Sequence, residues 1–326
     1  MPTGILVPTD ERDVAGFADR VEGLGYDSLW TGELWGRDAF VALSEAATRT
    51  DDIRLGTAIV NIYGRSPATL AQAVATLDRV SGSRAALGVG PSTRKAIEDL
   101  HGAAFDQPAR RLHETVELTR EFLQGEGRAS YDGECFEVAD FPALGVDVPV
   151  YAAALGPATR RATGRTAEGW LPHNIPFENL GTAFETIART AREAGRDPDD
   201  IRVAPYVPAA VDEDPEQARD AIRGHVAYYV GSGRGYQRAV AAEYPAADDV
   251  AEAWREGARE AARDRVSDEM VAGLGVAGTA DEARAQLDAV AALDVVDEPL
   301  VVIPGGVPQP MKERTVEALG PARQEG

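Results

Sequence analysis

Short apolar runs alternate with amphipathic stretches along nearly the whole chain, and this alternation constrains the fold more than any other feature. Several runs are continuously apolar, such as Val148–Ala154, which is typical of parallel strands covered by helices on both faces. Eight strands are predicted, at Gly4–Pro8, Asp27–Glu33, Arg54–Ile62, Ala85–Gly90, Val148–Ala154, Gly169–Asn174, Ile201–Val211 and Pro299–Pro304. Strands and helices that alternate from end to end indicate a parallel α/β fold.

Helix signals fill the gaps between these strands. Pro67 is a favourable first residue for one helix, and Gly82 follows its predicted end. Thr279 followed by Glu282 is the pattern of a capping box, at the start of the helix that leads into the last strand. With eight strands and no early G-x-G-x-x-G fingerprint, residues 1–326 are predicted to form a single TIM-type (β/α)₈ barrel. A doubly wound open sheet is the alternative.

Two segments interrupt the alternation. Ala129–Val138 is predicted to form a short hairpin that turns at Asp132-Gly133. Residues 225–275 are predicted to form a helical insertion before the last strand. Long insertions in barrels often cover the active mouth, so this one is expected to act as a lid or as a subunit interface.

The net charge of −21 is the most unusual bulk property, and lysine occurs only at Lys95 and Lys312. Acidic residues spread over the helices predict a hydrated surface of the kind found in halophilic, particularly haloarchaeal, proteins; an ordinary acidic enzyme is the alternative. Such a surface repels phosphates, so nucleic acids and anionic membranes are not expected as partners.

Other partners and compartments are limited by what the sequence lacks. Cys135 is the only cysteine, so no intrachain disulfide can form. No metal site is expected, because no H-x-x-x-H spacing with a supporting carboxylate occurs. No apolar run approaches the ~20 residues of a membrane span, and the first residues do not resemble a secretory signal, so a cytoplasmic protein is expected.

In a barrel, chemistry takes place at the carboxyl ends of the strands and in the loops that follow. This rule selects Glu33, Ala58, Ile59, Asn61, Gly88, Gly90, Ser92, Thr93, Lys95, Gly156, Pro157 and His173. The backbone of Gly88 and Gly90 can approach a flat ring or an anion, or it can serve turn geometry alone. Lys95 can pair with a phosphate or carboxylate, or be solvated. His173 can titrate at the mouth, or be a satisfied polar residue.

An ordered set of short segments carries a resemblance to a known family. The segments are Gly25–Trp30, Ile53–Thr57, Ser66–Ala68, Leu77-Asp78, Ser81–Arg84, Leu87–Gly90, Tyr151–Pro157, Ala167–Trp170 and Ala194–Pro198. With them the sequence resembles the bacterial luciferase-like monooxygenase superfamily. The likeness is strongest to its branch that depends on the deazaflavin coenzyme F420, which includes the methylenetetrahydromethanopterin reductases.

The resemblance implies a barrel that is commonly a homodimer and that binds F420 or, as the alternative, FMN. It implies a non-proline cis peptide at Ala58–Ile59 that backs the ring. It places the cofactor against Gly88–Ser92 and against the loop that contains Ala154, Gly156, Pro157 and Ala158. A methylene-pterin or folate-like substrate is one implication of the same likeness.

The sequence departs from the family at two positions that matter for proton transfer. Relatives carry an Asp-His pair where this chain has Glu33-Leu34, and Leu34 cannot move a proton. Relatives also place an acid where this chain has Thr93. The proton donor is therefore expected to be Glu33, His173 or a water held by Thr93.

Three functions remain open from the sequence. The first is an F420-dependent oxidoreductase that transfers a hydride between the deazaflavin and a small organic substrate. The second is a two-component monooxygenase that uses reduced FMN and oxygen. The third is a flavin-binding protein without catalytic activity.

Overall fold

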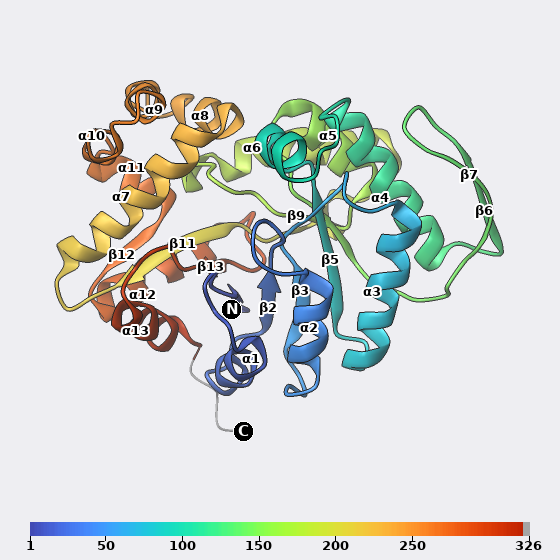
Figure 1. The fold of residues 1–326 in the computed structure, drawn as a ribbon, viewed down its shortest axis with the longest axis horizontal. Helices are drawn as coiled ribbons and strands as arrows, with labels where there is room; N and C mark the ends of the chain where they lie inside the picture. The colour runs from blue at the N-terminus through green and yellow to red at the C-terminus, as the bar shows by residue number, and fades with distance from the viewer. Residues whose placement is uncertain (322–326) are drawn as a thin grey trace.

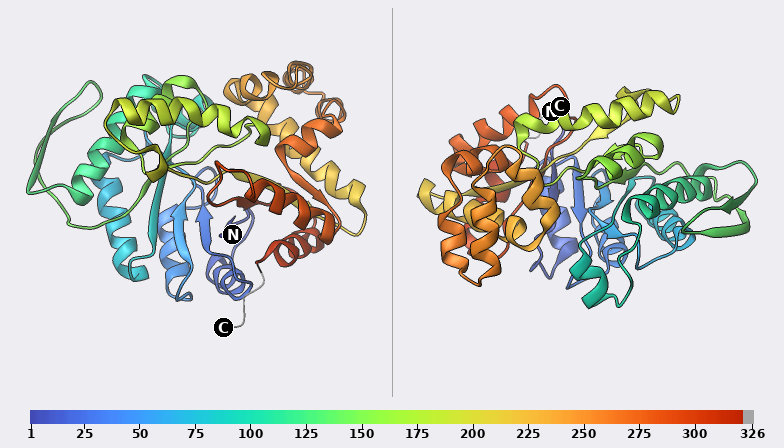
Figure 2. Two further views of the ribbon diagram at one scale, coloured as in Figure 1. Left: turned by 180° about the vertical axis from the view of Figure 1, so that it is seen from behind. Right: turned by 90° about the horizontal axis from the view of Figure 1, so that it is seen from above.

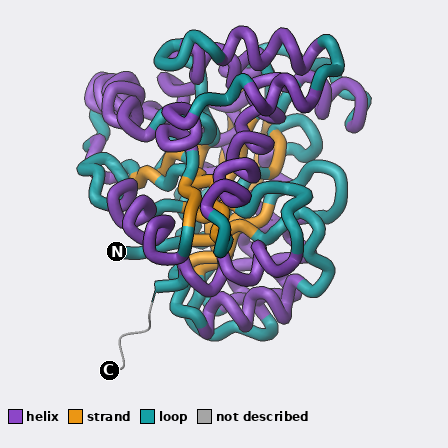
Figure 3. The backbone as a smooth tube through the Cα atoms, turned by 90° about the vertical axis from the view of Figure 1, so that its left-hand side faces the viewer, coloured by secondary structure: helices purple, strands orange, loops and turns teal. Residues whose placement is uncertain are grey.

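Parallel strands at the centre of the molecule are enclosed by helices (Figure 3). The computed structural model describes residues 1–321. Its central strands are β1 (Gly4–Leu6), β2 (Ser28–Thr31), β3 (Arg54–Thr57), β4 (Val60–Asn61), β5 (Ala85–Gly90), β8 (Val150–Ala152), β9 (Gly169–Trp170), β10 (Arg202–Val203), β11 (Tyr206–Val211), β12 (Val276–Gly278) and β13 (Leu300–Val302). They pair in parallel in the order β10-β9-β8-β5-β3-β2-β1-β13-β11-β12, with β4 beside β5.

The sheet closes on itself through β10 and β11, which are two halves of one extended segment. The N–H groups of Ala204 and Tyr206 donate to the carbonyls of Trp170 and Pro172, on the β9 side. Tyr206 also pairs with Leu300 of β13, on the other side.

The register confirms a closed barrel. When the pairings from Leu300 are extended through β1, β2, β3, β5, β8 and β9, they lead to the level of residue 198, just before β10, whereas Leu300 itself pairs with Tyr206. The offset of about eight residues is the shear of a (β/α)₈ barrel. The predicted barrel is therefore confirmed, and the doubly wound sheet is excluded.

Helices α1 to α6, α12 and α13 surround the barrel, while α7 to α11 gather at one corner of it (Figures 1 and 2). Their bounds are α1 (Val14–Gly23), α2 (Ala39–Ala47), α3 (Pro67–Ser81), α4 (Pro108–Gln124), α5 (Pro157–Thr166), α6 (Leu180–Glu193), α7 (Pro215–Ser232), α8 (Arg234–Ala241), α9 (Ala247–Arg255), α10 (Arg259–Asp264), α11 (Asp268–Leu274), α12 (Ala280–Ala291) and α13 (Gln309–Leu319).

The predicted helix signals act as expected. Helix α3 begins at Pro67 and is followed by Gly82, which has a φ of 71°, in the left-handed region that glycine adopts without strain. At the start of α12, the carboxylate of Glu282 accepts the backbone N–H of Thr279 at 2.8 Å.

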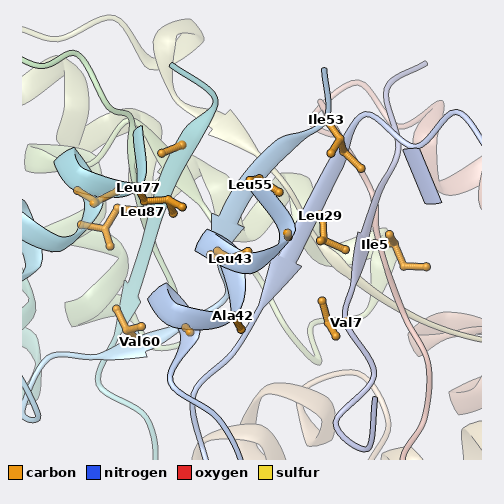
Figure 4. Close-up of a cluster of buried hydrophobic side chains, with 14 of the residues drawn as sticks. Ile5, Val7, Leu29, Ala42, Leu43, Ile53, Leu55, Val60, Leu77 and Leu87 are labelled. Carbon is orange, nitrogen blue, oxygen red and sulfur yellow. The ribbon is translucent and has the colours of Figure 1, made fainter. Parts of the chain in front are cut away.

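Hydrophobic contacts fill two layers. Outside the barrel, leucines such as Leu29, Leu55 and Leu87 on the strands pack in one cluster with Leu43 of α2 and Leu77 of α3 (Figure 4). Inside the barrel is a separate cluster, built from Trp30, Ala58, Ala86, Tyr151, Leu171, Ala204 and Leu300. The interior is thus a packed core, and only its end can open to a ligand.

Three features differ from the sequence predictions. The helical segment begins at Pro215, capped by Asp214, so residue 225 lies inside α7 rather than at its start. Strand β12, which was not predicted, pairs with the last three residues of β11, Ala209–Val211. The hairpin extends further than predicted, with strands β6 (Arg128–Asp132) and β7 (Glu137–Pro142), and it projects from the body beside α4 (Figure 1). Within residues 1–321, no helix combines the length and apolarity needed to cross a membrane.

Candidate functional site at the barrel mouth

The carboxyl ends of the strands form the open end of the barrel. Four side chains that pack on the interior cluster are only half-buried there: Leu6, Ile59, Ala153 and Tyr206. Leu6 ends β1, Ile59 follows β3 and Ala153 follows β8. These side chains therefore lie where the packed interior meets the mouth.

The bulge between β3 and β4 contains a cis peptide bond at Ala58–Ile59, as the resemblance implied. It is held against the loop after β2. The Ala58 N–H donates to the carbonyl of Thr31 at 2.8 Å, and the Glu33 N–H donates to the carbonyl of Ile59 at 3.1 Å. Gly32 is required at this contact, because a Cβ there would lie 2.8 Å from the Ala58 carbonyl oxygen.

Gly90 is the last residue of β5, which pairs with β4 on one side and with β8 on the other. It therefore lies between Ile59, which precedes β4, and Ala153, which follows β8. A Cβ on Gly90 would lie 3.0 Å from the Cβ of Ala153 and 3.4 Å from the side chain of Ile59. The three residues therefore lie side by side and form an apolar strip across three adjacent strands. We call this the ring strip.

Gly88 has a different role from the one predicted. It is buried in the barrel wall, and a Cβ there would lie 2.1 Å from the carbonyl oxygen of Thr57. The Thr57 hydroxyl donates to the Gly88 carbonyl and accepts its N–H, both at 2.8 Å. Glycine is therefore needed here for packing, and the structure does not bring Gly88 to the mouth.

Glu33 follows β2 as predicted, but its carboxylate already has partners. Both of its oxygens accept hydrogen bonds from the guanidinium of Arg65, and one also accepts the N–H of Ala39 at 3.2 Å. Arg65 also contacts Asp38. Hydrogen bonding to Glu33 raises the pKa of Arg65. The pair lies at the mouth, and the negative charge of Glu33 is offset by the positive charge of Arg65.

The loop after β5 carries three predicted residues. Ser92 has a positive φ of 58° and is half-buried. The Thr93 hydroxyl accepts the N–H of Ala96 at 3.2 Å, which caps the helical turn that follows. Lys95 is 74% exposed and is paired with Asp99, one turn further along. The structure therefore does not bring Lys95 to the other site residues.

Asn61 is buried, and both its amide oxygen and its amide nitrogen bond to groups of the protein. Its oxygen accepts the N–H groups of Tyr63 and Gly64, and its nitrogen lies 3.0 Å from Nε2 of His101. This arrangement fixes the turn after β4. A direct contact of Asn61 with a cofactor is therefore not supported.

The loop after β8 leads into α5. Ala154 is buried, and its carbonyl accepts the indole N–H of Trp170 at 2.9 Å. Gly156, Pro157 and Ala158 are exposed, and no side chain caps the first turn of α5. Free backbone N–H groups at a helix start favour a negative group.

His173, after β9, lies at the centre of a buried aromatic cluster. Its ring centroid is 4.8 Å from Tyr206, 4.4 Å from Tyr229, 5.5 Å from Tyr236 and 5.7 Å from His225. Burial lowers the pKa of His173 well below its usual 6.5, so the imidazole is neutral near pH 7. His173 therefore cannot act as a charged proton donor at that pH.

The sequence analysis did not select Tyr206, His225, Tyr229 or Tyr236. A signal for two of them does exist: His225 and Tyr229 are four residues apart, on one face of α7. Among residues 1–321, no three His, Cys, Asp or Glu side chains are grouped closely enough to hold a metal ion.

A closed barrel with a glycine-lined mouth defines a (β/α)₈-barrel protein whose site lies at the carboxyl ends of its strands. Residues 2–297 match the model of the luciferase-like monooxygenase family, and the chain belongs to that family.

Individual relatives give a finer comparison. The chain is 30% identical over 321 residues to 5,10-methylenetetrahydromethanopterin reductase of Methanolobus tindarius, with 97% of each chain covered. It is 26% identical over 299 residues to a putative coenzyme F420-dependent oxidoreductase of Mycobacterium tuberculosis, covering 82% of this chain and 84% of the relative. The structure of coenzyme F420-dependent tetrahydromethanopterin reductase from Methanopyrus kandleri matches with a TM-score of 0.82 and 27% identity, covering 98% of this chain and 97% of that one.

Proposed function

We propose that this protein is a coenzyme F420-dependent oxidoreductase that acts on a small organic substrate. The observation that carries the proposal is the ring strip, because the half-buried side chains of Ile59 and Ala153 lie on either side of Gly90 at the barrel mouth, next to the Ala58–Ile59 cis peptide. The relatives that cover nearly the whole chain support the choice of cofactor.

The residues at the mouth fit a deazaflavin. The ring strip and the Ala58–Ile59 backbone would support one face of the ring, and a side chain on Gly90 would fill this surface. The exposed backbone of Gly156, Pro157 and Ala158 would receive the anionic tail at the start of α5. F420, when bound, would supply the hydride chemistry, while the protein binds, orients and shields the reactants from water.

The roles of the polar residues follow from their partners. Glu33 would orient the ring edge while Arg65 holds its carboxylate in place through two hydrogen bonds. Thr93 would hold a water through the second lone pair of its hydroxyl oxygen, because the first accepts the Ala96 N–H. His173, neutral and buried, would act as a hydrogen-bonding group.

A methylene-pterin is the substrate that we favour, on the basis of the reductases among the relatives. We also propose that the protein is a homodimer, as sedimentation equilibrium would test. A mass equal to that of one chain at micromolar concentration would contradict the dimer.

Equilibrium titrations with F420 and with FMN test the proposed cofactor. We expect F420 to bind at least about tenfold more tightly than FMN, a difference of about 1.4 kcal/mol. Ala153→Leu places bulk on the ring strip and should weaken F420 binding about tenfold. Ala285→Leu, the same change on the exposed face of α12, is the control and should leave binding unchanged. Tight FMN binding without F420 binding would overturn the proposal.

A further inference from the structure

Several polar groups around His173 have no hydrogen-bond partner. Among the described residues, no partner exists for the hydroxyls of Tyr206, Tyr229 and Tyr236. Both amide atoms of Asn174, the next residue after His173, are buried and unpaired. Buried polar groups in folded proteins are nearly always paired, so the two Asn174 atoms indicate that a polar ligand or water completes them, and the nearby tyrosine hydroxyls are available to bind the same molecule.

The unpaired groups converge from four elements. Asn174 follows β9, Tyr206 begins β11, and Tyr229 and Tyr236 belong to α7 and α8. The rings of Tyr229 and Tyr236 meet edge to face at 5.2 Å. All three tyrosines are only half-buried, so their hydroxyls are not sealed from the outside.

This cluster adjoins the ring strip. Ala153 follows β8, and the neighbouring strand β9 leads to His173 and Asn174. Tyr206 packs on the same interior cluster as Ile59 and Ala153, the two side chains that border Gly90. The N-terminal part of α8 also reaches the loop after β8, because a Cβ on Gly235 would lie 3.8 Å from the Leu155 side chain. A molecule held by the tyrosines would therefore lie next to a ring on the strip.

The cluster carries no charge. Burial and neighbouring tyrosines raise the pKa values of Tyr206 and Tyr229, and burial with Tyr228 raises the pKa of Tyr236 to about 12. No described Arg, Lys, Asp or Glu side chain contributes to these shifts, nor to the lowered pKa of His173. A buried phosphate or carboxylate needs a cationic partner, and none is present here.

We propose that Tyr206, Tyr229, Tyr236 and Asn174 form the recognition site for an uncharged planar heterocycle that has several nitrogen and oxygen atoms. The tyrosine and histidine rings would pack against its flat surface, and the hydroxyls and the amide would bind its polar edge. The site excludes substrates whose recognised end is a phosphate or a carboxylate. This assignment rests on the proposed function, in that it takes the neighbouring strip as the cofactor site.

Calorimetric titration of the whole protein tests the assignment, with pterin as the uncharged probe and phenyl phosphate as the anionic one. We expect pterin to bind and phenyl phosphate not to bind. Each of Tyr206→Phe, Tyr229→Phe and Tyr236→Phe removes one neutral hydrogen bond and should weaken pterin binding roughly three- to tenfold.

Tyr228→Phe is the matched control. Tyr228 precedes Tyr229 on α7, but it is 43% exposed and makes no ring contact with His173. This variant should bind pterin as the unchanged protein does. Because phenylalanine keeps each ring, the variants should retain their thermal midpoints, and this is to be measured for each.

A separate F420 titration distinguishes the two proposals. If F420 fails to bind but pterin binds and depends on the three tyrosines, the proposed function fails and the recognition site stands. If F420 binds but pterin does not, the recognition site is overturned. It is also overturned if phenyl phosphate competes with pterin, or if Tyr228→Phe weakens pterin binding as much as Tyr229→Phe does.

Discussion

Glu33 and Arg65 join the loop after β2 to the loop after β4 through two parallel hydrogen bonds. Their side chains are only 13% and 19% exposed, so this ion pair is largely shielded from water. The bidentate geometry of arginine and carboxylate gives such a pair both strength and a fixed orientation. The pair therefore holds the two loops that flank the Ala58–Ile59 bulge.

Arg65→Met should lower the free energy of unfolding by about 2 kcal/mol, because it leaves the Glu33 carboxylate without its charged donor. Urea denaturation measures this loss. Arg189→Met is the control: Arg189 and Glu193 are both at least 60% exposed, so the change should be below about 0.5 kcal/mol. Equal losses in the two variants would contradict the role of the Glu33–Arg65 pair.

Acid should destabilise the protein through its buried histidines. Burial lowers the pKa of His225 to about 4, and that of His173 also lies well below 6.5. Below pH 6.5 the unfolded chain binds protons on these residues that the folded chain does not. Stability should therefore fall as the pH is lowered, by about 1.4 kcal/mol per pH unit for each histidine, until the folded pKa is reached.

Urea denaturation between pH 4.5 and 7, at constant salt, measures this slope. His225→Gln should reduce the slope by the contribution of one histidine. An unchanged slope in His225→Gln would show that the titration of His225 is not linked to folding.

Salt should stabilise the protein, because the net charge of −21 makes the folded chain repel itself. The screening length falls from about 10 Å at 0.1 M to about 3 Å at 1 M. The midpoint of thermal unfolding should therefore rise with sodium chloride over this range. Sucrose, which is excluded from protein surfaces without screening charge, is the control. A midpoint that does not respond to sodium chloride would contradict the expectation of a halophilic protein.

Glu114 should control the order of the β6–β7 hairpin. Its side chain is fully buried and accepts the N–H groups of residues 134, 135 and 136, together with Arg110. Burial alone would raise the pKa of Glu114, but these hydrogen bonds hold it below its usual value.

Glu114→Ala should cost about 3 kcal/mol and expose the hairpin to proteases. Limited proteolysis with mapping of the cut sites provides the measurement. Glu117→Ala removes a carboxylate that bonds only to side chains at the exposed surface, Tyr131 among them, so it should leave the hairpin resistant. Cuts outside residues 128–142 in Glu114→Ala would contradict a local role.

The barrel could be predicted because its signal is repeated. Eight buried runs, each followed by a helical stretch, leave few alternative folds, and all eight correspond to barrel strands. Strand β12 could not be predicted, since Val276–Gly278 is only three residues long and ends in glycine. Pro205 also divides the seventh strand, because proline cannot donate a ladder hydrogen bond.

The site was only partly predictable. The positions of Ile59 and Gly90 followed from strand ends and from the family resemblance, and the structure brings both to the mouth. Lys95 was selected because it follows the fourth predicted strand, but a position in the loop does not say where the side chain points, and this side chain is exposed and paired with Asp99. Tyr229 and Tyr236 reach His173 only through the folding of a distant helical segment, which spacing along the chain does not reveal.

The helices that carry those two tyrosines have a hydrophobic core of their own. Val226, Val240, Val250 and Met270 of α7 to α11 belong to a cluster separate from the one inside the barrel. The ring strip and the helices that carry Tyr229 and Tyr236 thus rest largely on different packing, although Ala210 of β11 and Met311 of α13 connect the second cluster to the barrel. Under the proposed function, this division would let selection change the substrate through α7 to α11 while the barrel interior and the redox partner stay the same.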